Sequence, residues 1–205
     1  MGRSCWRWRD RCRRTSTLSF DLARSLRRIK PEKIKRTPTP RRASDRPFVT
    51  ERTGPGRELL LDTTVYVDVL QGRAPAEVKA LLRLRLINHS SVSVSELSYL
   101  FGRLDPADAR TPPVLHTISR VIDDMPAHRT RPPSVRAAAE AGMMAGVVAR
   151  LRGAAAKQER STLNDALLYA HAIEHGFVVL TRNVRDFDLF DQLWPADGVL
   201  FYGAA

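Results

Sequence analysis

The sequence predicts an α/β fold, in which helices cover both faces of a mostly parallel sheet and a basic, disordered tail precedes it. From Glu58 onward, short apolar runs of strand length alternate with longer amphipathic stretches, as in parallel α/β sheets. Before Glu58, prolines and arginines are dense and apolar periodicity is weak, so little apolar surface is available for folding. We therefore divide the 205-residue chain into an extension, residues 1–57, and a domain, residues 58–205.

The formal net charge of +12 is concentrated in the extension. Residues 1–57 contain 18 of the 34 Lys and Arg residues but only 5 of the 22 Asp and Glu residues. The domain is therefore close to neutral, and its charge is no argument that it binds nucleic acid. Two interpretations of the extension stay open: a solvated terminus with a short helix near residues 20–29, or a basic arm or transit peptide.

The composition of the domain excludes several kinds of site. Cys5 and Cys12 both lie in the extension, so the domain has no disulfide framework, no thiolate zinc site and no cysteine nucleophile. No apolar stretch approaches the roughly 18 to 20 residues that span a bilayer. We expect a soluble protein of the reducing cytoplasm with no membrane partner.

The first half of the domain contains two predicted strands and three predicted helices. Leu59, Leu60 and Leu61 form an apolar run that is too short for a helix and typical of a strand buried on both faces. Apolar residues at helical spacing predict a helix over 77–87, and the Ser-Val alternation predicts a strand over 91–94. Helices are expected to follow over 95–104 and 113–125.

The second half repeats this alternation. A short extended piece is expected at 129–131 and a long helix at 134–151, whose small residues allow close packing. Ser161 or Thr162 is a candidate N-cap for a helix over 163–175. The remaining expected elements are a buried strand at 177–180, a helix at 187–193 and a last strand at 199–202.

Acidic residues follow the predicted strands, where parallel sheets place their ligand sites. Asp62 comes directly after the first strand, Glu96 lies two residues past the second, and Asp186 lies six residues beyond the strand at 177–180. Asp165 falls in the first turn of the helix over 163–175, where a carboxylate is common. Each acid alone is an ordinary turn or helix residue, but carboxylates gathered at one sheet edge repel each other and need a cation.

The types of side chain indicate which cation. Carboxylates without a nearby His or Cys suit Mg²⁺ or Mn²⁺ better than zinc. Such an ion keeps coordination positions for water and for phosphate oxygens. The acidic residues therefore predict metal-assisted hydrolysis of a phosphate ester.

Four segments also carry a family resemblance. They are Leu60-Leu61-Asp62-Thr63-Thr64-Val65, Ser93-Val94-Ser95-Glu96-Leu97, Asn164-Asp165-Ala166 and Leu180-Thr181-Arg182-Asn183-Val184-Arg185-Asp186-Phe187. In this order they resemble the acidic motifs of PIN-domain nucleases, and most closely the VapC-type ribonuclease toxins of bacterial toxin–antitoxin modules. The resemblance extends over roughly residues 58–202.

The resemblance implies a three-layer α/β/α sandwich and an endoribonuclease that depends on Mg²⁺ or Mn²⁺. It implies a toxin that acts on an RNA substrate and is neutralised by a cognate antitoxin, and it leaves a homodimer open. Asp62, Glu96 and Asp165 match the first three acidic positions of the family and would hold the metal.

The fourth acidic position departs from the family pattern. Asn183 stands where many relatives carry an acid, so either Asp186 supplies the charge or Asn183 acts as a neutral ligand. Thr181 would be a hydroxyl donor in the site. Arg182 and Arg185 flank the same loop, and they either contact RNA phosphates or form a solvated surface pair.

Two other functions compete with the nuclease. Asn183 motivates a non-catalytic PIN module that binds RNA or a protein partner. An aspartate after a first buried strand is also found in phosphatases of the haloacid dehalogenase type, but their chemistry needs a second Asp at position 64, which is Thr here. Tyr66, Tyr99 and Tyr169 lie near the motifs, where each could stack on a base but is more typical of a core residue.

Overall fold

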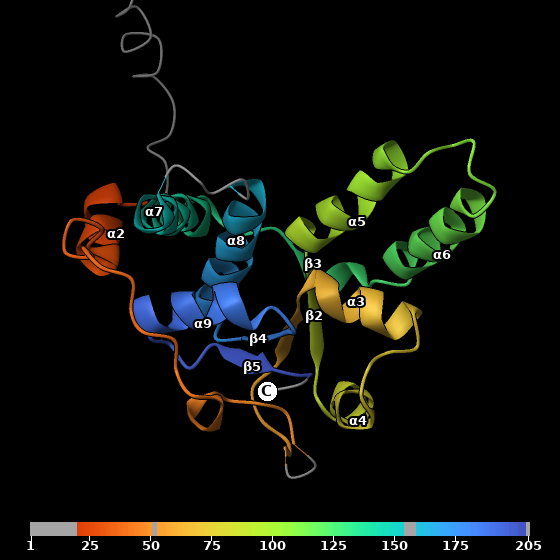
Figure 1. Ribbon diagram of the computed structural model, residues 1–205, viewed down its shortest axis with the longest axis horizontal. Helices are drawn as coiled ribbons and strands as arrows, with labels where there is room; N and C mark the ends of the chain where they lie inside the picture. Colours follow the sequence, from red (N-terminus) through yellow and green to blue (C-terminus); the bar gives the residue numbers. More distant parts are fainter. Residues whose placement is uncertain (1–19, 51–52, 154–158, 204–205) are drawn as a thin grey trace, which may run out of the picture.

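The computed structural model describes residues 20–50, 53–153 and 159–203, and it is built around one parallel sheet (Figure 1). The five strands are arranged in the order β3-β2-β1-β4-β5, and each neighbouring pair is parallel. This confirms the predicted α/β fold class. The strands are β1 (Leu59–Leu61), β2 (Ile87–Ser90), β3 (Thr130–Arg131), β4 (Val178–Thr181) and β5 (Val199–Phe201).

Helices account for most of the remaining described chain. No helix in residues 20–50, 53–153 or 159–203 is long and apolar enough to cross a membrane. The α-helices are α2 (Leu22–Ile29), α3 (Thr63–Leu70), α4 (Ala76–Leu84), α5 (Ser91–Arg103), α6 (Thr111–Asp123), α7 (Val135–Arg152), α8 (Glu159–His175) and α9 (Val184–Leu193), and the short 3₁₀ helices are η2 (Ala43–Asp45) and η3 (Ala127–Arg129).

The sheet separates two helical layers (Figure 1). Successive strand residues point to opposite faces, so Leu60 packs with α7, α8 and α9, whereas Leu59 and Leu61 pack with α3, α4 and α5. The same alternation continues in β4, where Val179 faces the first layer and Leu180 the second. This is the expected three-layer α/β/α sandwich.

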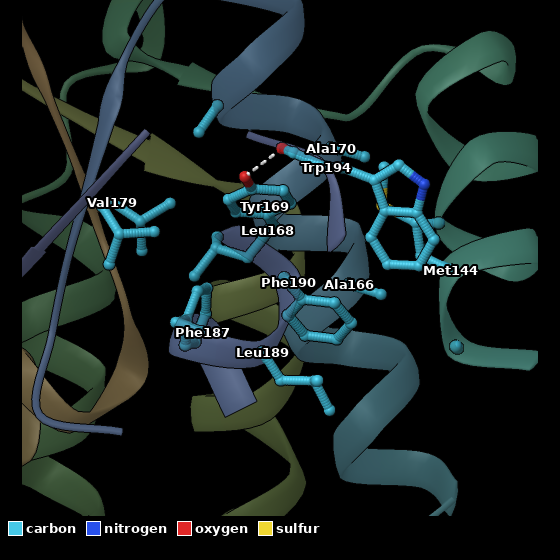
Figure 2. Close-up of a cluster of buried hydrophobic side chains, with 14 of the residues drawn as sticks. Met144, Ala166, Leu168, Tyr169, Ala170, Val179, Phe187, Leu189, Phe190 and Trp194 are labelled. Carbon is cyan, nitrogen blue, oxygen red and sulfur yellow. Dashed lines mark hydrogen bonds between the residues drawn. The ribbon is translucent and has the colours of Figure 1, made fainter. Parts of the chain in front are cut away.

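Aromatic packing fixes helices α8 and α9 against each other (Figure 2). The Tyr169 and Phe190 rings stack with their centroids 5.8 Å apart, and the Tyr169 hydroxyl donates a 2.7 Å hydrogen bond to the Trp194 carbonyl. All three side chains are buried. Helix α8 carries Asp165 and helix α9 begins after Asn183, so this cluster also sets the relative position of two parts of the candidate site.

Residues 20–50 differ from the expected disordered extension. Helix α2, which matches the short helix expected at 20–29, packs against α7 and buries Ile29. Phe48 forms a parallel bridge to Phe201 at the edge of β5. Disorder was expected because prolines and arginines are dense here and little apolar surface is available, but Arg28 and Arg41 pair with buried acids of the domain and therefore favour packing. Residues 1–19 of the expected tail lie outside the described part of the chain.

The predicted strand at 91–94 is wrong. The strand is β2 at Ile87–Ser90, where the expected helix 77–87 would have ended, and 91–94 is the first turn of α5. The Ser90 hydroxyl accepts a 3.2 Å hydrogen bond from the Val92 amide and so caps the helix. Glu96 consequently projects from the second turn of α5 rather than from the first turn of the helix expected over 95–104.

Three other helices begin earlier than expected or were not expected. The sequence patterns did not indicate α3, which starts directly after Asp62. Helix α8 starts at Glu159, so Asp165 lies in its second turn and Ser161 and Thr162 are not N-caps. Helix α9 starts at Val184, and the Asn183 side chain caps it by accepting from the Asp186 amide at 3.3 Å.

Candidate active site

A cavity of about 720 Å³ opens at the carboxyl edge of the sheet, where α5, α8 and α9 approach the ends of β1 and β4. All four predicted acids line it: Asp62, Glu96, Asp165 and Asp186. These residues come from four separate segments of the chain. The parallel strands and the helices that follow them therefore bring the predicted site together as the sequence analysis expected.

Asp62 is the least exposed of the four acids that line the cavity. Its side chain is 4% exposed, and its Oδ2 accepts hydrogen bonds of 2.6 Å from both the Thr64 and the Thr181 hydroxyl. Thr181 is thus the hydroxyl donor that was predicted. Burial raises the pKa of Asp62 above its ordinary value, although the two hydroxyls act in the opposite direction.

Glu96 reaches the cavity from α5 and is held by two neutral donors. The Thr63 hydroxyl donates to one carboxylate oxygen, and Asn164 Nδ2 donates to the other at 2.8 Å. Asn164 precedes Asp165 on α8, so this contact couples two helices that carry acids. The carboxylate has a defined orientation but no positive partner among these contacts.

Asp165 and Asp186 are bridged by an amide. Asn183 Nδ2 donates to Oδ2 of Asp165 and to Oδ2 of Asp186, both at 3.0 Å. Burial, followed by the charges of Asp62, Asp186 and Glu96, raises the pKa of Asp165 to about 9. Asn183 and Asp186 therefore both lie in the cavity, Asn183 as a neutral hydrogen-bond donor and Asp186 as a carboxylate, and both alternatives for the fourth position remain predictions.

Asp186 differs from the other cavity acids because it has an arginine partner. Arg152, the last residue of α7, pairs with Oδ1 of Asp186 and donates a 3.1 Å hydrogen bond to the Thr162 hydroxyl. Burial acts to raise the pKa of Asp186, but the hydrogen bonds from Asn183 and Arg152 and the charge of Arg152 lower it overall. The sequence analysis missed Arg152, and no local pattern distinguishes it from the other arginines of the chain.

Counter-charges separate Asp62 and Asp165 from the other buried acids. Five of the buried acids in the described ranges form ion pairs with arginines. Neither Asp62 nor Asp165 lies within ion-pair distance of a described Lys, Arg or His. The full set of buried acids in these ranges is Asp62, Asp68, Glu140, Asp165, Asp186, Asp188 and Asp191.

The chemistry of the cavity fits a hard divalent cation. Its donors are carboxylate, amide and hydroxyl oxygens, which Mg²⁺ and Mn²⁺ prefer. As the side chains stand, no three His, Cys, Asp or Glu residues in the described ranges converge on one point as direct ligands. Mg²⁺ commonly takes only one or two carboxylates directly and reaches the rest through water. Asp62 and Asp165, the two buried carboxylates without an ion-pair partner in the described ranges, could supply these direct ligands.

The two arginines expected to contact phosphates lie in different surroundings. Arg185 lines the acidic cavity. Arg182 does not line it, and its Nε lies 3.2 Å from Oδ2 of the buried Asp68. Arg182 therefore serves as a counter-charge within the fold, because a buried carboxylate without a partner is costly.

Comparisons with known proteins bear on the fold and the family. The family model of the PIN domain matches residues 59–193 of the chain. No curated protein matches the chain.

Several solved structures are similar to the chain. VapBC2 from Rickettsia felis bound to a promoter DNA fragment is 18% identical, with a TM-score of 0.45, over 71% of this chain and 98% of that one. DNA-bound VapBC from Salmonella typhimurium is 18% identical, with a TM-score of 0.44, over 72% and 98%. FitAcB from Neisseria gonorrhoeae is 23% identical, with a TM-score of 0.47, over 70% and 96%.

Proposed function

The chain belongs to the PIN-domain family, and from this premise we propose that it is an endoribonuclease that requires Mg²⁺ or Mn²⁺. The observation that carries the proposal is the pair of buried carboxylates, Asp62 and Asp165, that have no ion-pair partner in the described ranges. A divalent cation would offset their repulsion, and the cavity is large enough for a phosphodiester as well.

Each residue of the cavity has a role in this proposal. Asp62 and Asp165 would hold the cation, with Glu96 as a further ligand directly or through water. When bound, the cation would lower the pKa of a coordinated water and stabilise charge on the phosphate.

Neutral side chains orient those acids. The Thr64 and Thr181 hydroxyls both donate to Oδ2 of Asp62. Because the carboxylate is rigid, this also fixes the position of Oδ1. Asn183 holds Asp165 and Asp186 at a fixed separation through one amide. Arg185 at the cavity wall would bind a phosphate oxygen of the substrate.

Cleavage of RNA by the purified chain tests the proposal. We expect cleavage in Mg²⁺ or Mn²⁺, none in chelator, and a loss of at least about 100-fold in Asp62→Asn, which keeps the shape of the side chain. Asp108→Asn is the matched control, because Asp108 forms an exposed ion pair with Arg110 away from the cavity. Cleavage that persists in chelator or in Asp62→Asn would show that this site is not the nuclease centre.

A non-catalytic PIN module that binds RNA or a partner protein is the second candidate. The observation that favours it is the neutral Asn183 at the fourth acidic position. It predicts RNA binding by Asp165→Asn together with no cleavage by the unaltered protein in either metal.

The resemblance of the motifs to VapC-type toxins leads us to propose a biological role. The chain would act as the toxin of a toxin–antitoxin pair in the cytoplasm, and a cognate antitoxin would block the acidic cavity. Expression of the chain should arrest growth, whereas expression of Asp62→Asn should not, and a small neighbouring reading frame should restore growth. Growth arrest by both forms would contradict this role.

A further inference from the structure

Tyr99 is an exposed aromatic side chain at the wall of the acidic cavity. It lies on α5, three residues after Glu96, so both side chains project from the same side of the helix. Its side chain is 43% exposed, whereas Tyr66 and Tyr169 are buried. The structure thus separates the three tyrosines near the motifs, and only Tyr99 presents its ring at the cavity.

Two arginines surround the Tyr99 ring. The Arg160 guanidinium lies 4.2 Å from the ring centroid, and that of Arg103, one turn further along α5, lies 6.0 Å away. Both arginines line the cavity, and neither forms an ion pair with an acid in the described ranges. Arg28, Arg41 and Arg152, by contrast, each pair with a buried acid.

The arrangement has the two parts that a site for single-stranded nucleic acid needs. An exposed aromatic ring offers a flat surface on which a base can stack, and nearby guanidinium groups attract the backbone phosphates. The position of Arg160 shows that the ring face accepts a planar group at van der Waals distance. The acids a helical turn away define where the phosphodiester would be cleaved.

We propose that Tyr99, Arg103 and Arg160 form a base-binding subsite, in which an unpaired base of the substrate stacks on Tyr99. The base takes the place of the Arg160 guanidinium over the ring, and Arg160 and Arg103 then contact the phosphates on either side of that nucleotide. This inference rests on the proposed function, because the ligand is the RNA strand whose backbone enters the acidic cavity. A base inside a duplex is already stacked and paired, so the subsite selects unpaired nucleotides.

Binding measurements test the subsite separately from cleavage. The probes are a short fluorescein-labelled single-stranded RNA and an oligonucleotide of the same length without bases, each titrated by fluorescence anisotropy with Asp62→Asn protein in Mg²⁺. In that background we expect Tyr99→Ala to weaken binding of the RNA roughly 5- to 150-fold and to leave binding of the baseless strand unchanged. Tyr99→Phe, which keeps the ring, should bind the RNA as the parent does.

Phe101 supplies a matched control. It lies on the same helix, is 44% exposed and does not line the cavity, so Phe101→Ala removes an aromatic ring of similar exposure from outside the subsite. Phe101→Ala should bind both probes like the parent. Arg160→Ala should weaken binding of both probes, because both carry phosphates.

Each outcome bears on one of the two proposals. Unchanged RNA binding by Tyr99→Ala, or equal weakening for RNA and the baseless strand, would overturn the subsite even if the wild-type protein cleaves RNA. Base-dependent loss of binding in a protein that never cleaves RNA would support the subsite and overturn the nuclease proposal. No binding of either probe would overturn the subsite.

Discussion

Two groups of buried acids, one against the N-terminal segment and one in the cavity, are accommodated in different ways. Beneath the N-terminal segment, Glu140, Asp188 and Asp191 each pair with an arginine that comes from residues 20–50. In the cavity, Asp62 and Asp165 accept hydrogen bonds from hydroxyls and an amide and have no ion-pair partner in the described ranges.

The arginine-paired group shows what the fold does when a buried acid is structural. Arg41 Nε lies 2.6 Å from Oδ1 of Asp188, and its Nη2 lies 2.9 Å from Oδ2 of Asp191. Arg46 Nε lies 3.7 Å from Oδ2 of Asp188, so two arginines face these two carboxylates. Arg28 pairs with Glu140, which also accepts a 2.9 Å hydrogen bond from Ser25. Every charge in this group is compensated by the chain itself.

The difference teaches how to distinguish a structural acid from a functional one. Burial alone does not do so, because both groups are less than 10% exposed. The distinguishing property is a missing counter-charge, which leaves a cost that a bound cation or uptake of a proton can remove. We expect the first group to govern folding stability and the second to govern metal binding.

Removal of Arg41 should have the largest effect on stability. Arg41→Ala leaves the buried Asp191 without its arginine and leaves Asp188 with only Arg46, 3.7 Å away, so we expect the free energy of unfolding to fall by about 3 to 5 kcal/mol. Urea unfolding measured by circular dichroism checks this. Arg42→Ala is the matched control, because Arg42 is 89% exposed and should change stability by less than about 0.5 kcal/mol. Equal effects of the two substitutions would contradict the claim that the arginine-paired acids govern folding stability.

The cavity group should make the metal-free protein less stable as the pH rises. The pKa of Asp165 is raised to about 9 in the folded state, so the folded protein binds more protons than the unfolded chain between about pH 4 and 9. Stability is therefore greatest at the low end of this window, and it should fall with rising pH by roughly 1 kcal/mol per pH unit.

Urea unfolding in chelator, repeated from pH 5 to pH 8, measures this slope. Asp165→Asn removes the titrating group and should flatten the dependence on pH. A slope that is the same in Asp165→Asn and in the wild type would mean that the cavity acids are not the source of the effect.

Asp186 should behave in the opposite way, because Arg152 keeps its pKa below the ordinary value. Such an acid contributes stability above its unfolded pKa and loses that contribution as the pH falls. Arg152→Met should therefore destabilise the protein by about 1 to 3 kcal/mol at pH 7 and by less at pH 4. The control is Arg150→Met, since Arg150 donates only to the Pro31 and Ile34 carbonyls in the described ranges and should show no such dependence on pH.

The sequence predicted the features that depend on local pattern and on the order of the elements. Short apolar runs identified β1 and β4, and the rule for parallel sheets placed Asp62 and Asp186 at one edge. The Ser-Val alternation before Glu96 was misleading, because Ser90 caps a helix there and the valines lie on its first turns. Helix α3 was missed because β-branched residues at its start, Thr63 to Val65, favour a strand.

The counter-charges could not be predicted in the same way. The partners Arg28 and Glu140 are 112 residues apart in the sequence, and Arg41 and Asp191 are 150 apart. Ion pairs of such separation leave no periodic or local signal, so the arginines of residues 20–50 could only be read as a charged, disordered segment. For the same reason the sequence could not show which acids of the domain lack a partner.

A calorimetric titration of Mn²⁺ into the metal-free protein tests the central claim most directly. We expect saturable binding by the wild type, strong weakening in Asp62→Asn and in Asp165→Asn, and unchanged binding in Asp108→Asn. The claim is that Asp62 and Asp165 bind a divalent cation. It would be contradicted if the wild type showed no heat of binding, or if all four proteins showed the same heat.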